Sequence, residues 1–149
     1  MRHSSLFLLI LTLLVAACAG SAGDQISSSV VTLRITDNST EKSYTAEDLQ
    51  ALEATQVYFR DIAYVGVPLA VLLRDAGFDP EAVKAVKAVA EDGFSANYDV
   101  ALVNRVDTIV AYAQADGPLS EDEGSFRMVL PDQEGKLNVR QLVEIQVIQ

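Results

Sequence analysis

The chain has 149 residues, with 21 acidic and 11 basic side chains and a formal net charge of −10. A balance this acidic argues against nucleic acid and anionic lipid headgroups as partners. The only cysteine is Cys18, so the chain cannot form an internal disulfide.

Residues 1–17 have the features of a secretory leader. Residues 1–3 form a short basic region, and residues 6–17 form an apolar run that is shorter than a typical membrane-spanning helix. The run ends in Val-Ala-Ala before Cys18, which resembles a bacterial lipoprotein cleavage site, where the cysteine becomes the lipid-bearing N-terminus. We therefore expect lipidation of Cys18 and a membrane anchor outside the cytoplasm. An ordinary secretory peptide that happens to contain a cysteine is the alternative.

Cys18 is followed by Ala19 and not by Asp. By resemblance to sorted lipoproteins, this favours the outer over the inner membrane in a diderm bacterium. Residues 18–29 then form the lipidated cysteine and a small, polar stretch that indicates a flexible tether. Residues 30–149 are long enough for one domain with its own core.

Loss of the leader also removes His3, the only histidine. The mature chain therefore excludes Ser-His-Asp and Cys-His catalysis, histidine zinc sites and haem ligation by histidine. Without residues 1–17, 132 residues remain, with 10 Lys and Arg against 21 Asp and Glu.

The first elements are two strands followed by a helix. Residues 30–36 predict a half-buried strand that turns Val31, Leu33 and Ile35 to one side. After a turn, residues 42–44 return as a short strand. Thr45 then opens a helix, with Asp48 completing an imperfect capping box.

A second group of elements surrounds a proline. Residues 55–59 and 62–65 predict two short strands. Pro68 is well placed to begin a helix whose buried face carries Leu69, Leu72, Leu73 and Ala76. Gly77 is expected to cap that helix, with the following Phe78 folding back as a hydrophobic contact.

The stretch 82–90 is ambiguous from its residues alone. An approximate three-residue repeat and the residue propensities allow a helix. Residues 91–93 are typical of a hairpin turn that leads into a return strand at 94–98. Residues 100–104 predict a short helical or irregular link.

The stretch 107–131 forms the centre of the domain. Thr108 to Ala115 predict a strand buried on both faces, and Asp116-Gly117-Pro118 end it. Residues 126–130 predict its antiparallel partner, with 116–125 as a wide, solvent-exposed acidic loop. A final strand is expected to bury Val143, Ile145 and Val147.

These blocks resemble the oxidoreductase molybdopterin-binding domain of the sulfite-oxidase type. The resemblance covers about residues 43–149 and rests on three stretches in order, at 64–77, 90–94 and 107–131. It implies a single α+β domain, mostly β. It also favours a strand over a helix from about Lys84 to Ala90.

The resemblance fails at the residue that would carry the chemistry. Catalytic members of the family hold molybdenum through a cysteine thiolate, in a loop that precedes the segment matched here from Tyr64. The corresponding stretch, 57–63, contains no cysteine, and Cys18 lies at the start of the tether. We therefore expect a degenerate site, with no catalytic residue, no metal and no cofactor.

Arg60, Asp61 and Tyr64 are our candidates for a residual ligand site, because Arg60-Asp61 occupies the position of the family's metal loop. Arg60 is one of a few arginines that could bind an anion; the others are Arg105, Arg127 and Arg140. The acidic residues Asp116 and 121–123 could gather around calcium, but a solvated acidic loop is the better interpretation. Most of the aromatic side chains are better explained as core than as a ligand-facing cluster; they are Tyr58, Phe59, Tyr64, Phe94, Tyr98, Tyr112 and Phe126.

Three functions remain open. The first is a lipid-anchored cell-envelope protein with a non-catalytic version of this domain, which binds a protein partner or a small ligand. The second is an oxidoreductase, or a subunit of one, that holds molybdopterin with weak metal ligation or with a metal ligand supplied by a partner. The third is a purely structural envelope lipoprotein.

Overall fold

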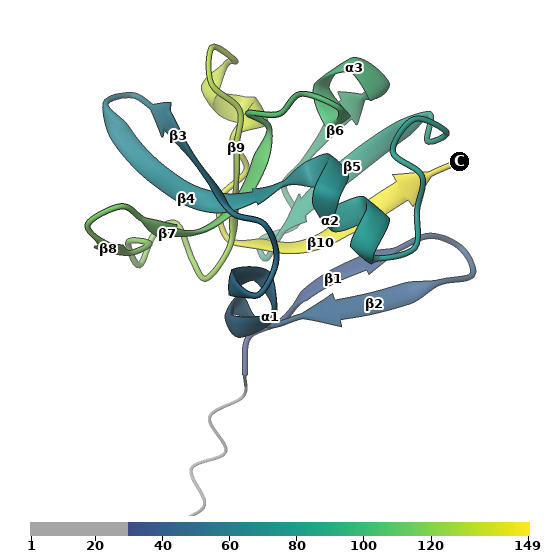
Figure 1. The fold of residues 1–149 in the computed structure, drawn as a ribbon, viewed down its shortest axis with the longest axis horizontal. Helices are drawn as coiled ribbons and strands as arrows, with labels where there is room; N and C mark the ends of the chain where they lie inside the picture. Colours follow the sequence, from purple (N-terminus) through teal and green to yellow (C-terminus); the bar gives the residue numbers. More distant parts are fainter. Residues whose placement is uncertain (1–29) are drawn as a thin grey trace, which may run out of the picture.

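The computed structural model describes residues 30–149, so the leader, Cys18 and the tether lie outside the described residues. The described chain folds into two sheets with short helices between and beside their strands (Figure 1). The first sheet has the order β2-β1-β10-β5-β6. Its strands are β1 (Leu33–Thr36), β2 (Glu41–Tyr44), β5 (Ala85–Ala90), β6 (Ser95–Asp99) and β10 (Leu142–Ile148).

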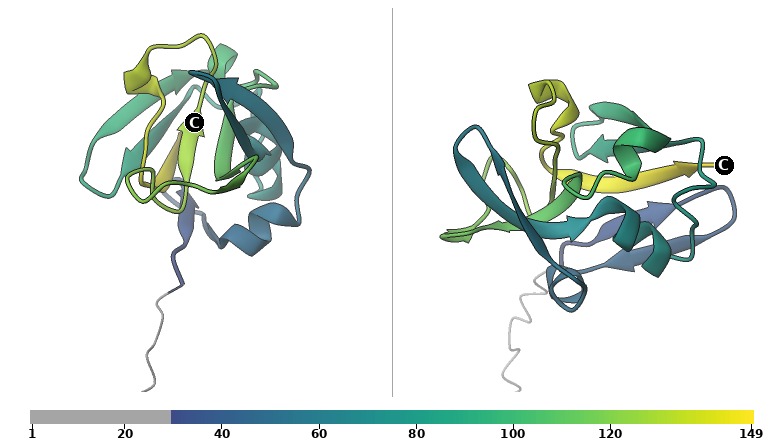
Figure 2. Two further views of the ribbon diagram at one scale, coloured as in Figure 1. Left: turned by 90° about the vertical axis from the view of Figure 1, so that its left-hand side faces the viewer. Right: turned by 45° about the horizontal axis from the view of Figure 1, so that its top comes forward.

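The second sheet has the order β3-β4-β7-β8, and β9 also pairs with β7. Its long β3–β4 hairpin projects from the body of the domain (Figure 2). The strands are β3 (Thr55–Phe59), β4 (Ile62–Pro68), β7 (Ile109–Gln114), β8 (Gly117–Pro118) and β9 (Arg127–Val129).

The main core lies between the two sheets. It combines Leu33 and Ile145 from the first sheet with Val67, Val110 and Met128 from the second, all 0% exposed. Burying such side chains contributes about 1.5–3 kcal/mol each. A smaller cluster, which includes Val57, Tyr64 and Ile109, packs within the second sheet.

The ends of the first two helices lie within about one residue of where the local sequence predicts. In α1 (Ala46–Gln50), the Thr45 hydroxyl accepts from the Asp48 N–H while the Asp48 carboxylate accepts from the Thr45 N–H, so the capping box is complete. The helix α2 (Leu69–Asp75) begins one residue later than expected, because Pro68 is its N-cap and the last residue of β4; Ala76 is its C-cap, and Gly77 follows with a φ of +93°. The Phe78 N–H bonds back to the Leu73 carbonyl at 2.9 Å, as in a Schellman motif.

Several strand predictions are confirmed. The stretch 85–90 is strand β5 and not a helix. The link after β6 is the short helix α3 (Val100–Val103), which the Asp99 side chain caps. The central pairing is also confirmed, because β7 and β9 are antiparallel with Val110 opposite Met128.

Three expectations about strand faces and loops are wrong. Val31 is 52% exposed because β1 begins only at Leu33, where pairing with β2 starts. A bulge between Leu142 and Glu144 makes Leu142, and not Val143, the first buried residue of β10. The loop 116–125 is not wholly exposed: β8 pairs with β7, and Glu123 is only 5% exposed.

A close approach of strands fixes the middle of the second sheet. The register of β4 on β7 shifts between Val65 and Gly66. A Cβ atom on Gly66 would lie 2.2 Å from the carbonyl oxygen of Val110, so only glycine fits this position.

Candidate functional site

A cleft of about 600 Å³ lies beside the β3–β4 hairpin, with its other walls formed by the end of β7 and by residues 120–127 and 135–140. In Figure 1 the β3–β4 hairpin lies at the upper left of the molecule, with β7 and β8 below it. The cleft is lined by Phe59, Arg60, Tyr64, Glu123, Arg127 and Arg140, among other residues. It therefore collects three of the four arginines singled out in the sequence.

The tip of the hairpin carries Arg60 into this cleft. Phe59 pairs with Ile62, so the turn between them consists of Arg60 and Asp61, with φ of +49° and +65°. Positive φ at both central residues matches the right-handed twist of the flanking strands. The Arg60 guanidinium lies 5.2 Å from the centre of the Phe59 ring.

Arg60 also reaches across the cleft. Its Nη2 atom lies so close to Gly135 that a Cβ atom added there would be 3.0 Å away. Within residues 30–149, Arg60 forms no salt bridge. It therefore presents an exposed positive charge without a carboxylate partner at the rim of the cleft.

A buried ionic group forms the floor of the cleft. Tyr64, Glu123 and Arg127 are 2%, 5% and 4% exposed. The Tyr64 hydroxyl donates to the Glu123 carboxylate at 2.6 Å, and Arg127 Nη1 donates to both of these side chains. The Arg127 guanidinium also lies 4.6 Å from the centre of the Tyr64 ring, which adds a cation–π contact.

The remaining oxygen of Glu123 is equally well satisfied. It accepts from Gln114 Nε2 at 2.8 Å, from the Ser120 N–H at 3.0 Å and from the Ser120 hydroxyl at 2.7 Å. A buried carboxylate is costly unless it is paired and hydrogen-bonded, and Glu123 meets both conditions.

This environment sets the charges of the floor. Burial alone would raise the pKa of the Glu123 carboxyl, but hydrogen bonds from Tyr64, Ser120 and Arg127 outweigh it and lower the pKa to about 2. Burial and the hydrogen bond to Glu123 raise the pKa of Tyr64 to about 12. At neutral pH Glu123 is therefore an anion and Tyr64 a neutral donor.

The upper wall of the cleft is held by two further side chains. Asn138 is 4% exposed, and its amide oxygen accepts from the Leu130 N–H at 2.8 Å. Arg140 pairs with Asp122 at 2.5 Å on the surface. Of the charged side chains that line the cleft, only Arg60 has no ion-pair partner among the described residues.

The structure brings together two of the three candidate site residues. Arg60 and Tyr64 line the cleft. Asp61 is exposed at the hairpin tip and does not line the cleft. Among the other arginines, Arg127 and Arg140 join the cleft, whereas Arg105 binds Asp107 elsewhere.

The expectation of a solvated acidic loop is wrong for Glu123, which is buried. Glu123 turns inward to Arg127 while Asp122 turns outward to Arg140, so the acidic side chains do not converge on one point. Within residues 30–149, no group of three or more His, Cys, Asp or Glu side chains is arranged to hold a metal ion.

Sequence reasoning missed Glu123, Gln114 and Ser120 as parts of the floor. The spacing of Glu123 and Arg127 by four residues is a weak signal in a segment with no helical pattern. Among the aromatic side chains expected to be mostly core, Tyr64, Tyr98 and Phe126 are buried. Tyr58 and Phe94 are instead 64% and 48% exposed.

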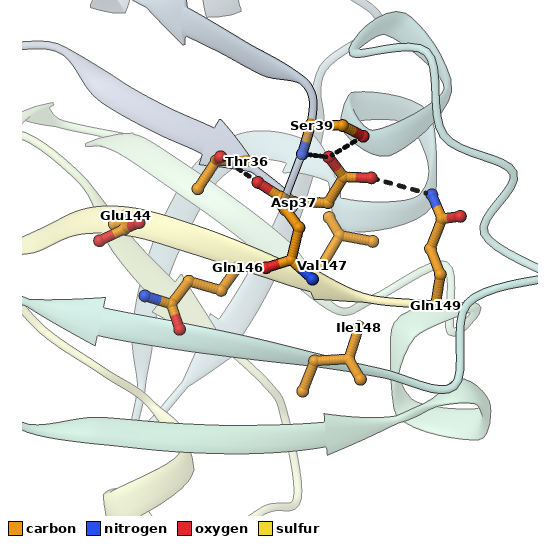
Figure 3. Close-up of a pocket in the computed structure, with 9 residues that line it drawn as sticks. Thr36, Asp37, Ser39, Glu144, Gln146, Val147, Ile148 and Gln149 are labelled. Atoms are coloured by element: carbon orange, nitrogen blue, oxygen red, sulfur yellow. Dashed lines mark hydrogen bonds between the residues drawn. The ribbon is translucent and has the colours of Figure 1, made fainter.

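A second cleft of similar volume, about 610 Å³, lies where β1 and β10 end. Figure 3 shows that the Asp37 carboxylate there accepts from the N–H and hydroxyl of Ser39 and from the Gln149 amide. The Asp37 carboxylate is thus used in hydrogen bonds that stabilise the local turn. We therefore take the cleft beside the β3–β4 hairpin, called the arginine-lined cleft below, as the candidate site.

A family model for the oxidoreductase molybdopterin-binding domain matches residues 25–149. The chain belongs to this family. The fold expected from the resemblance, a single sulfite-oxidase-like domain of mostly β structure, is therefore confirmed. No curated protein matches the chain.

Among solved structures, this oxidoreductase molybdopterin-binding domain is similar to the sulfane dehydrogenase SoxCD from Paracoccus pantotrophus. The TM-score is 0.68 and the sequence identity is 22%, over 79% of this chain and 38% of that chain. The chain thus spans well under half of that relative. At this identity the similarity shows the shared fold.

The residues of this family member do not fit a molybdenum-pterin cofactor. Residues 30–149 contain neither cysteine nor histidine, so the cleft offers no thiolate to the metal. An anionic cofactor entering the cleft would also meet the Glu123 carboxylate at the floor, where it already engages Arg127.

Proposed function

We propose that this protein is a lipid-anchored protein of the bacterial cell envelope, held by Cys18, whose domain binds a ligand or partner in the arginine-lined cleft without catalysis. The ligand class that fits is a small molecule or peptide end with an anionic group next to an apolar body. Arg60 would pair with the anionic group, and Phe59 and Ile62 would contact the apolar part.

One observation carries this proposal: Arg60 is the charged residue of the cleft that has no partner within residues 30–149. A guanidinium presents several N–H donors in a planar fork that suits carboxylates and phosphates. The cleft also lacks a cysteine or histidine, so binding is better supported than metal-based catalysis. Within the described residues, no helix is long and apolar enough to cross a bilayer.

The ligand site is tested by native mass spectrometry of the protein purified from membranes of its host. We expect a co-purifying anionic molecule on the wild type and its loss in Arg60→Ala. The matched control is Arg74→Ala, because Arg74 is also exposed but lies in α2 beside a different cleft. Equal retention by both variants would remove Arg60 from the site.

The family assignment keeps the oxidoreductase alternative open. Expression in a host that makes molybdopterin, followed by elemental analysis, distinguishes the two proposals. We expect no stoichiometric molybdenum or pterin and no sulfite oxidation above background. About one molybdenum per chain, retained through gel filtration, would support the oxidoreductase instead.

The anchor is tested separately. Mass spectrometry of the mature N-terminus should show an acylated Cys18, and Cys18→Ser should release or misprocess the protein. An unmodified N-terminus downstream of Cys18 would contradict the anchor. A purely structural role would be favoured if the intact lipoprotein carried neither ligand nor partner.

A further inference from the structure

Five donors converge on the carboxylate of Glu123. They are the Tyr64 hydroxyl, Arg127 Nη1, Gln114 Nε2, and the N–H and hydroxyl of Ser120. Both carboxylate oxygens are engaged, and the side chain is 6% exposed although it lines the cleft. Charge-assisted hydrogen bonds of this kind are about twice as strong as neutral ones.

Most of these donors are positioned by the sheet and not by Glu123. Tyr64 and Gln114 are directly opposite each other in the β4–β7 pairing. Arg127 is opposite Ala111 in the β7–β9 pairing. Three strands therefore hold two neutral donors and one guanidinium around a single point at the bottom of the cleft.

We propose that these groups form a carboxylate-binding site which the protein's own Glu123 occupies. The floor of the cleft is closed to external anions while Glu123 is in place. It becomes a receptor for a small external carboxylate when that side chain is removed. The inference rests on the proposed function only in taking the cleft as the binding site, and it leaves Arg60 at the rim for the ligand.

The test is rescue by acetate. Glu123→Ala removes Cγ and the carboxyl group, which together have the size and charge of acetate. The variant leaves the buried Arg127 charge without its partner, so we expect its Tm to fall by roughly 10 °C. Acetate at ten times its dissociation constant should then raise that Tm by roughly 5 °C.

Three controls define the site. Chloride at equal ionic strength and acetamide, which has the shape of acetate but no charge, should give no rescue. The double variant Glu123→Ala/Arg127→Met should also lose the acetate effect. In an Arg60→Ala background, which lacks the proposed anion contact at the rim, the protein with Glu123 intact should show no acetate response in its Tm and no shift of its Tyr64, Gln114 and Arg127 NMR signals.

The outcomes separate this inference from the proposed function. A folded Glu123→Ala variant with the same acetate response as the wild type would overturn it, as would saturable acetate shifts at Arg127 in Arg60→Ala with Glu123 intact. If Glu123→Ala needs acetate to refold from urea, the inference is supported, and if it fails to refold even with acetate, the inference is wrong. Arg60→Ala should leave the rescue intact, so failure of ligand retention and failure of rescue are distinguishable.

Discussion

The hydroxyl of Tyr64 donates a 2.6 Å hydrogen bond to Glu123, 59 positions further along the chain. Tyr64 lies in β4, whereas Glu123 lies in the acidic segment between β8 and β9. Because both residues are buried and share Arg127 Nη1 as a donor, this contact joins the hairpin, the acidic segment and β9 at the floor of the cleft.

Stability should therefore depend on the ionisation of Glu123. Its pKa is lowered from 4.5 to about 2 in the folded protein, so its contribution is fully present above the unfolded value and is lost as the pH falls toward 2. The difference corresponds to about 3 kcal/mol at neutral pH. Urea unfolding from pH 7 to pH 2 should show this loss.

The matched variant for the pH experiment is Glu123→Gln, which keeps the size of the side chain but cannot ionise. It should be less stable than the wild type at pH 7, with a smaller difference at pH 2. Parallel pH profiles of the two proteins would show that the carboxylate of Glu123 does not contribute in this way.

Gly66→Ala should be strongly destabilising. The added Cβ atom would lie 2.2 Å from the Val110 carbonyl oxygen and 2.6 Å from Ala111 Cα, and both are backbone atoms that cannot turn aside. We expect a loss of at least about 2 kcal/mol in the free energy of unfolding. Gly117→Ala is the control, since a Cβ atom there meets nothing within 4 Å. Similar losses in both variants would contradict the close approach.

Thr108→Val should stabilise the protein. Thr108 is 0% exposed, and its hydroxyl is a buried polar side-chain atom with no hydrogen-bond partner in the described chain. Valine keeps the shape of threonine and removes the unpaired hydroxyl, for a gain of about 1 kcal/mol. Thr108→Ser, which keeps the hydroxyl, should not stabilise. A destabilised Thr108→Val variant in thermal unfolding would indicate that the hydroxyl is satisfied.

Tyr112→Asp should destabilise the protein by roughly a few kcal/mol, because it replaces the packing of a large aromatic side chain with a charge beside the core. Tyr112 is partly buried on β7 and packs against the main core. Asp122→Asn should have only a small effect, because Asp122 is exposed and pairs with Arg140 at the surface. Equal shifts in the thermal midpoint would argue against this placement of β7.

The local structure could be predicted from the sequence because its causes are short-range. The capping box of Thr45 and Asp48 involves residues three apart, and the glycine end of α2 involves residues 73–78. The alternation of apolar and polar residues correctly placed Leu33 and Ile35 on the buried face of the first strand. The three blocks at 64–77, 90–94 and 107–131 were enough to indicate the family.

The sequence pointed to Arg60 and Tyr64, but tertiary structure alone decided the floor of the site. The stretch 120–125 reads as a solvated acidic loop, and its composition does not distinguish Glu123 from Asp122. Glu123 is buried because Tyr64, Gln114 and Arg127 come together in the sheet, and their pairing supplies the donors that offset the cost of burying a carboxylate. Likewise, Arg60 lies beside Gly135 because the β3–β4 hairpin folds against a segment 75 residues later. Contacts between residues so far apart in the sequence depend on how the two sheets pack. A local sequence pattern does not determine that packing.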